Sequence, residues 1–337
     1  MAARKIQLRA PAGTLPSLRA AVDAGADGVF TGLRSLSNIR NFPGINFSVQ
    51  ELREGLEYAH ERDKEIYVAI NAYPQGDLVQ AVYRDIETTV SLGVDALIIA
   101  DLAAMRFVHD HFPEMPVQVS VQGGAATARF INMLRDEFGI KGVVLPRILS
   151  MEEIAAVRRA TDVEIETFAF GLLCINYEPN CTMSCYVTGV PNQTYGACSP
   201  AELIEFDESA DTLEMRLDGY LMNSFTAEEV RTYPTPCKGR YREERSGRVT
   251  YPFQSPSSLQ TMTMLPAFVE AGVDALKIEG RQRSKMYVRE AVSVFREAID
   301  AYYADPARFT VRPEWEARLA ALFEGGEFTT TAYGEKT

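Results

Sequence analysis

The stretch Ala271-Gly-Val-Asp-Ala-Leu-Lys-Ile278 decides the fold, because close copies of it recur along the chain. The copies are Ala24-Gly-Ala-Asp-Gly-Val-Phe-Thr31, Leu92-Gly-Val-Asp-Ala-Leu-Ile-Ile99 and, more loosely, Phe138-Gly-Ile-Lys-Gly-Val-Val-Leu145. Each copy follows an amphipathic stretch and ends in a short apolar run. We expect the glycine to end a helix in the left-handed conformation and the aspartate to turn the chain into a buried parallel strand. Repeated helix–glycine–strand units are typical of a βα architecture.

Eight short apolar runs are candidate strands. They lie at residues 6–10, 28–32, 66–71, 96–100, 117–121, 143–146, 165–170 and 275–279. Helical patterns lie beside them, at residues 15–24, 49–62, 78–91, 103–112, 127–138, 151–160, 258–271 and 284–303. Eight such units predict a (β/α)8 barrel of the TIM-barrel type, with an open doubly wound sheet as the structural alternative.

The regular spacing breaks after the seventh predicted strand, because about 100 residues separate it from the eighth, too many for an ordinary loop. We therefore predict a cysteine-rich insertion at residues 172–255, between strands seven and eight. The barrel itself is assigned to residues 1–171 and 256–310, and residues 311–337 form a C-terminal tail. Barrels build their active sites at the carboxyl ends of the strands, which is where the insertion begins.

The bulk composition indicates a globular protein with an acidic surface. The chain has 337 residues, of which 46% are hydrophobic, and a formal net charge of −12. That charge argues against a nucleic-acid-binding surface, which needs a basic stripe. The first residues lack the apolar core of a secretory signal, and no run approaches the roughly 18 apolar residues of a membrane span. We therefore expect a cytoplasmic protein with no membrane span and no nucleic-acid partner.

All five cysteines lie in one part of the sequence, namely Cys174, Cys181, Cys185, Cys198 and Cys237. Packing explains such crowding poorly, whereas thiolates gathered in one segment are typical ligands of zinc or of an iron–sulfur cluster. Structural zinc sites usually show two paired knuckles, and only Cys181 and Cys185 have that spacing. Dispersed cysteines favour iron–sulfur over zinc, but the spacing leaves both open and does not say which cysteine is spare.

Three stretches that surround or follow these cysteines are distinctive. They are Glu166-Thr-Phe-Ala-Phe-Gly-Leu-Leu-Cys174-Ile-Asn-Tyr-Glu-Pro-Asn-Cys181, Pro234-Thr-Pro-Cys237-Lys-Gly-Arg-Tyr241 and Lys277-Ile-Glu-Gly-Arg-Gln-Arg-Ser284. With them the chain resembles the peptidase U32 family along nearly its whole length, and within it the UbiU group of oxygen-independent ubiquinone biosynthesis. The resemblance implies a [4Fe–4S] cluster whose ligands are Cys174, Cys181, Cys198 and Cys237. Cys185 then falls outside the ligand set.

The resemblance also implies an activity. Similar proteins hydroxylate the ring of ubiquinone precursors without O2, with prephenate as the oxygen donor and a UbiV-like paralogue as partner in a heterodimer. A lipid-carrying accessory protein is a further expected partner. Arginine binds carboxylates bidentately, so Arg147 and Arg281, which follow predicted strands, are our candidates for binding the donor. Asp101 and Glu279, also at strand ends, are candidate proton donors.

Three other functions remain open at this point. One is a U32-type hydroxylase of RNA bases, which the acidic charge disfavours. The second is a non-catalytic iron–sulfur subunit that stabilises a catalytic partner. Proteolysis, which the family name suggests, is disfavoured because the sequence has no recognisable Ser-His-Asp, Cys-His or His-Glu-x-x-His arrangement.

Overall fold

The computed structural model describes residues 5–41, 43–174, 181–190 and 198–334. Its centre is a closed ring of eight parallel strands, in which β14 pairs with both β1 and β7. The barrel strands are β1 (Gln7–Pro11), β2 (Gly28–Thr31), β3 (Glu65–Ile70), β4 (Ala96–Ile99), β5 (Val117–Val119), β6 (Gly142–Val144), β7 (Glu164–Leu172) and β14 (Ala275–Ile278). The predicted (β/α)8 barrel is therefore confirmed, and the open-sheet alternative is wrong.

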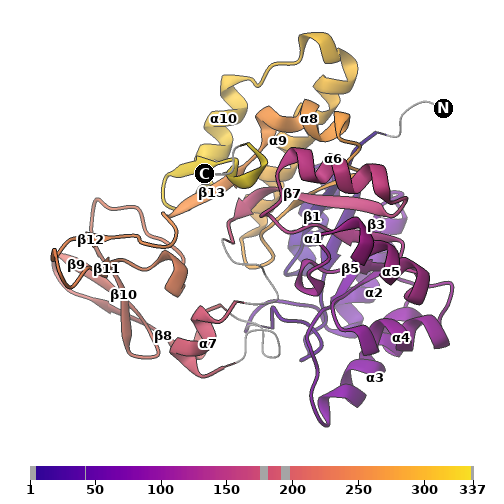
Figure 1. Cartoon of the computed structure of the whole chain (residues 1–337), viewed down its shortest axis with the longest axis horizontal. Helices are drawn as coiled ribbons and strands as arrows, with labels where there is room; N and C mark the ends of the chain where they lie inside the picture. Colours follow the sequence, from indigo (N-terminus) through magenta and orange to yellow (C-terminus); the bar gives the residue numbers. More distant parts are fainter. Residues whose placement is uncertain (1–4, 42, 175–180, 191–197, 335–337) are drawn as a thin grey trace.

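Helices surround the strands on the outside of the barrel (Figure 1). They are α1 (Leu15–Asp23), α2 (Val49–His60), α3 (Leu78–Ser91), α4 (Leu102–His111), α5 (Ala128–Phe138), α6 (Met151–Ala160) and α9 (Lys285–Ala304). Two of them begin with a capping box, in which Ser48 or Ser150 exchanges hydrogen bonds with the glutamate three residues later. Such caps satisfy backbone N–H groups that a helix leaves without internal partners.

The repeated phrase has a physical role at each barrel turn. Its glycines have positive φ angles, for example 81° at Gly93 and 76° at Gly272. Its aspartate bonds to the preceding barrel strand: the Asp27 carboxylate accepts a hydrogen bond from the Leu8 backbone N–H at 2.8 Å. The Asp95 carboxylate does the same with β3, and the Asp274 carboxylate with β7. The phrase therefore ends a helix, reverses the chain and fixes the register of the next strand.

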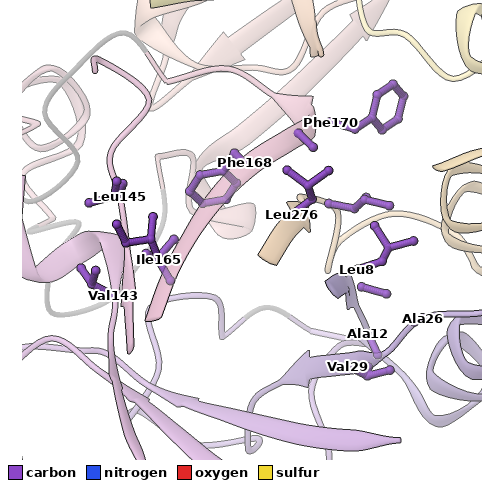
Figure 2. Packing of buried hydrophobic residues seen from close by; sticks show 14 of the residues in the cluster. Leu8, Ala12, Ala26, Val29, Val143, Leu145, Ile165, Phe168, Phe170 and Leu276 are labelled. Carbon is purple, nitrogen blue, oxygen red and sulfur yellow. The ribbon is translucent and has the colours of Figure 1, made fainter. Parts of the chain in front are cut away.

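A layer of apolar side chains lies between the strands and the helices. Figure 2 shows part of it, including Leu8, Val29, Val143, Ile165 and Leu276, each from a different barrel strand. All five are at most 1% exposed, which makes this layer the main core of the protein.

One predicted helix is wrong. Residues 258–271 form strand β13 (Ser257–Gln260), a short 3-10 turn, and only then the brief helix α8 (Leu265–Glu270). The cause lies in β7, which has nine residues and extends past its neighbours. Its last residues therefore have an open edge, and β13 pairs with that edge in antiparallel fashion, with Gln260 opposite Phe170. Pro266, in the first turn of α8, also restricts where the helix can begin.

The chain between β7 and β13 forms small units beside the barrel (Figure 1). They are α7 (Met183–Thr188), a three-stranded antiparallel sheet of β8 (Ile204–Glu208), β9 (Thr212–Leu217) and β10 (Tyr220–Thr226), and a hairpin of β11 (Tyr241–Arg242) and β12 (Val249–Thr250). After α9 come α10 (Pro313–Ala320) and β15 (Glu327–Thr329), which pairs with β13. Within the described ranges, no helix has the length and apolar character that crossing a membrane requires.

Short 3-10 turns occupy Val121–Gly123, Ala201–Leu203, Pro236–Lys238, Met262–Met264, Pro306–Arg308 and Thr331–Tyr333.

Candidate functional site

A pocket opens at the carboxyl ends of the barrel strands. Its inner wall consists of strand residues that face the barrel interior, namely Phe30, Ala69, Ile98, Val144, Phe168 and Lys277. Loop residues form the outer part, and they include Cys174, Cys181, Cys198 and Cys237. The empty space between these residues, counted together with the open solvent at the mouth, is about 1340 Å³. This is the position at which barrel enzymes place their active sites.

The four cysteines that the family resemblance singled out thus lie around one pocket, each half-buried. Burial raises the pKa of the Cys237 thiol, and the nearby Cys198 adds to the shift while a hydrogen bond with Thr235 opposes it. Burial also raises the pKa of Cys181, again with a contribution from Cys198. Thiols that disfavour ionisation next to one another are stabilised as thiolates by a bound metal centre.

Their present arrangement does not converge on a single point. Among the described residues, no three His, Cys, Asp or Glu side chains are grouped closely enough to hold one metal ion. An iron–sulfur cluster distributes its cysteine ligands over several irons, so its ligands are spread more widely than those of a single ion. The donor type and number are those that a cysteine-ligated iron–sulfur cluster takes. Cys185 does not line the pocket, and its Sγ lies 3.3 Å from the Thr182 carbonyl oxygen.

Two arginines come together on one side of the pocket. Arg281 follows β14 and is only 6% exposed, and its Nη1 has no hydrogen-bond partner among the described residues. Burial, together with the nearby Arg40 cation, lowers the pKa of Arg281 to about 9, and Glu279 opposes the shift. Asn38 connects the two arginines, because its Oδ1 accepts from the Arg40 backbone N–H at 3.0 Å and from Arg281 Nη2 at 3.5 Å. A buried cation without a full set of partners is a binding position for an anion.

Arg40 also contacts one of the cysteines. Burial alone would lower the pKa of Arg40, but its interactions with Cys198, Tyr233 and Glu279, including a side-chain hydrogen bond to Cys198, raise it overall. A guanidinium that donates to sulfur favours the thiolate form of the cysteine. The sequence reasoning missed Arg40, because only the folded loop after β2 brings it to a cysteine more than 150 positions away.

Of the other predicted site residues, Arg147 and Glu279 line the pocket and Asp101 does not. Arg147 lines the pocket, where it donates to the Leu172 carbonyl oxygen and stacks on the Phe168 ring at 3.9 Å. Glu279 also lines the pocket and accepts a hydrogen bond from the Leu172 backbone N–H at 3.2 Å. Asp101 is not among the lining residues; its carboxylate caps α4 by accepting from the Ala104 N–H at 2.9 Å.

Two buried lysines in the pocket wall were not predicted as site residues. Lys238 directly follows Cys237 and forms an ion pair of 2.7 Å with Glu324. Lys277 belongs to the fold-deciding phrase and pairs with Glu166 of β7 at 2.5 Å. A lysine at a strand position that should be apolar is the sequence signal that could have identified Lys277.

The model of peptidase family U32 matches residues 13–337. The chain belongs to peptidase family U32. Among curated relatives of this U32 chain, "tRNA hydroxylation protein P1" of Bacillus subtilis (strain 168) is 31% identical over 335 residues, which cover 99% of this chain and 72% of that protein. "tRNA hydroxylation protein P" of Escherichia coli (strain K12) is 33% identical over 321 residues, covering 88% and 68%. The solved structure titled "The Structure of the U32 Peptidase Mk0906" has a TM-score of 0.44 at 16% identity, over 52% of this chain and 72% of that one.

Proposed function

We propose that this chain is an oxygen-independent U32 hydroxylase that adds oxygen to an aromatic ring bound in the barrel pocket. One observation carries the proposal: four cysteines and three arginines, Arg40, Arg147 and Arg281, line the same pocket at the carboxyl ends of the strands. The names of the tRNA-hydroxylating relatives support the reaction class. The protease reading gains no support from the pocket lining, which contains no histidine among the described residues.

The proposed cofactor is a [4Fe–4S] cluster held by Cys174, Cys181, Cys198 and Cys237. Such a cluster would supply electron transfer, which a protein without an oxidising side chain needs for ring hydroxylation. The chain's own part is to exclude water, to hold the ring against the apolar wall and to bind the oxygen donor. Arg147 and Arg281 are the proposed carboxylate-binding groups for a donor such as prephenate, with Arg40 beside them.

Two ring substrates have specific support. An RNA base is favoured by the names of the relatives, and these names count against our expectation that nucleic acid is not a partner. The ring of a ubiquinone precursor is favoured by the mostly apolar inner wall and by the net charge of −12, which repels a phosphate backbone. We give the RNA base first place, because the relatives' names specify tRNA hydroxylation, and we keep the quinone precursor, with a UbiV-like partner subunit, as the second candidate.

The test begins with anaerobic purification and iron, sulfide and zinc analysis. We expect about four irons and four sulfides per chain, retained in Cys185→Ala and lost in Cys237→Ala. The loaded protein, with prephenate and without O2, is then offered a ring-labelled quinone precursor or unmodified tRNA, and hydroxylated product is measured by mass spectrometry. Product from tRNA alone would support the RNA base, and product from the quinone precursor alone would move the function to the quinone ring. Stoichiometric zinc without iron would overturn the redox proposal.

A further inference from the structure

The barrel interior contains a column of buried charges on the side formed by β1, β7 and β14. At its centre is Glu166, which is not exposed to solvent. Glu166 pairs with Lys277 at 2.5 Å, accepts a hydrogen bond from Gln118 Nε2 at 3.2 Å and lies 3.9 Å from Arg9 Nε. Arg9 in turn reaches Glu65 at 2.5 Å, toward the amino ends of the strands. Barrel interiors are usually filled with branched apolar residues, and removing charged groups from water costs free energy. This column of buried charges is therefore an exception that needs an explanation.

Lys277 is the member of the column that reaches the pocket. It is 6% exposed, lines the inner wall, and its Nζ lies 3.7 Å from the centre of the Phe30 ring. The charged groups that act on it are Glu166, Arg9 and Arg281. Burial lowers its pKa, the carboxylate of Glu166 opposes this, and the cations of Arg9 and Arg281 add to the lowering. A lysine in such surroundings releases a proton more readily than a lysine in water.

Arg9 has a different role in the column. Burial alone would lower the pKa of Arg9, but its interactions with Tyr67 and Glu166 raise it overall, so this guanidinium does not pass protons. Its Nε lies 3.9 Å from the Glu166 carboxylate, which also pairs with Lys277 at 2.5 Å, so Arg9 and Lys277 share one buried carboxylate. Replacing a buried ion pair by apolar residues is often neutral for stability, so folding alone does not require this arrangement.

We propose that Lys277 is the acid–base residue of the pocket and acts on an oxygen atom of the bound ring. In this step an N–H bond of the Lys277 ammonium breaks, an O–H bond forms on the ring oxygen that gains negative charge, and neutral amine remains beside Glu166. Water returns the proton to the amine when the ligand leaves. The substrate class is therefore an aromatic ring with a hydroxyl or carbonyl oxygen directed at the inner wall. The identity of the ligand in this inference rests on the proposed function. The titration of Lys277 does not depend on it.

The first experiment measures the titration of Lys277 directly. In protein with ¹³C-labelled lysine, the Cε resonance of Lys277 is the one that disappears in Lys277→Arg, or in Lys277→Met if the arginine variant does not fold. We expect it to titrate at lower pH than the exposed lysines, and at still lower pH in Glu166→Gln, because the opposing carboxylate is gone. Titration at or above the pH of the exposed lysines would overturn the proposal, whichever substrate the enzyme uses.

The second experiment uses the cluster-loaded enzyme and the ring substrate identified by product analysis. Lys277→Arg preserves a cation but holds its proton more tightly than lysine does, so we expect substrate binding to persist while turnover falls by about 100-fold or more. The alkaline limb of the pH–rate profile should lie at lower pH in Glu166→Gln than in the wild type. The difference should match the change in the titration of the Lys277 Cε resonance. Full activity in Lys277→Arg would reduce Lys277 to a binding cation and refute the acid–base role. If neither ring substrate is converted, the proposed function fails, and the resonance titration still decides the protonation behaviour of Lys277.

Discussion

The two sides of the barrel interior differ in chemistry although they are built from the same kind of strand. On the side of β2, β3 and β4 the interior holds a separate apolar cluster that includes Phe30, Ala69 and Ile98. On the side of β1, β7 and β14 it holds the ion pair of Glu166 and Lys277. The apolar layer outside the strands is continuous around both sides. The fold therefore depends on the outer layer, and the interior is free to differ where the pocket needs charge.

The largest predicted effect concerns the buried ion pair. Glu166→Leu and Lys277→Met, made singly, each leave an uncompensated charge inside the barrel and should lower the free energy of unfolding by about 3–5 kcal/mol. The double variant should recover most of this loss, because no buried charge remains without a partner. Urea unfolding of the three variants measures the effect.

The matched control lies on the apolar side. Ile98→Val removes one methylene group from the interior cluster and should cost only about 0.5–1.5 kcal/mol. A double variant that is as unstable as the sum of the two single ones would show that the charged side stabilises the fold, and the contrast between the two sides would then be wrong.

The second prediction concerns Arg281 and pH. Its folded-state pKa of about 9 lies below the ordinary value of 12.5, so between these values the unfolded chain binds more protons than the folded one. The contribution of Arg281 to the free energy of unfolding therefore increases as the pH rises between these two pKa values. Relative to Arg281→Met, the wild-type free energy of unfolding should increase by about 1 kcal/mol between pH 8 and pH 10, without added ligand. Parallel pH curves for the two proteins would show that Arg281 is solvated or paired in the folded state.

The barrel could be predicted from the sequence because the residues that specify each helix–strand unit are close together along the chain. The repeated phrase joins a helix end, a glycine with positive φ and an aspartate within eight residues, and each copy precedes a strand that the structure contains. Strand β14 is an example, since residues 275–279 were predicted and Ala275–Ile278 was found. Periodicity likewise gave α3 and α6 their observed bounds.

The features that could not be predicted depend on contacts between segments that are far apart in the sequence. Strand β13 forms because β7 offers an open edge, and nothing in the local pattern of residues 257–260 distinguishes that strand from the start of a helix. Lys277 and Glu166 are 111 positions apart, so their pairing follows only from the register of β14 against β7. The approach of Arg40 to Cys198 requires the segment after β2 and the segment after β7 to meet at the pocket that both residues line.

The smallest predicted effect separates two carboxylates at strand ends. Asp101 follows β4 on the apolar side and caps α4, whereas Glu279 follows β14 on the charged side and lines the pocket. Asp101→Ala should therefore lower the free energy of unfolding by about 1 kcal/mol, while Asp101→Asn, which keeps a capping oxygen, should be nearly neutral. Both variants should retain the wild-type rate of hydroxylation under conditions where they are folded. A loss of turnover in Asp101→Asn at unchanged stability would return Asp101 to the list of proton donors, because asparagine preserves the cap but does not carry an acidic proton.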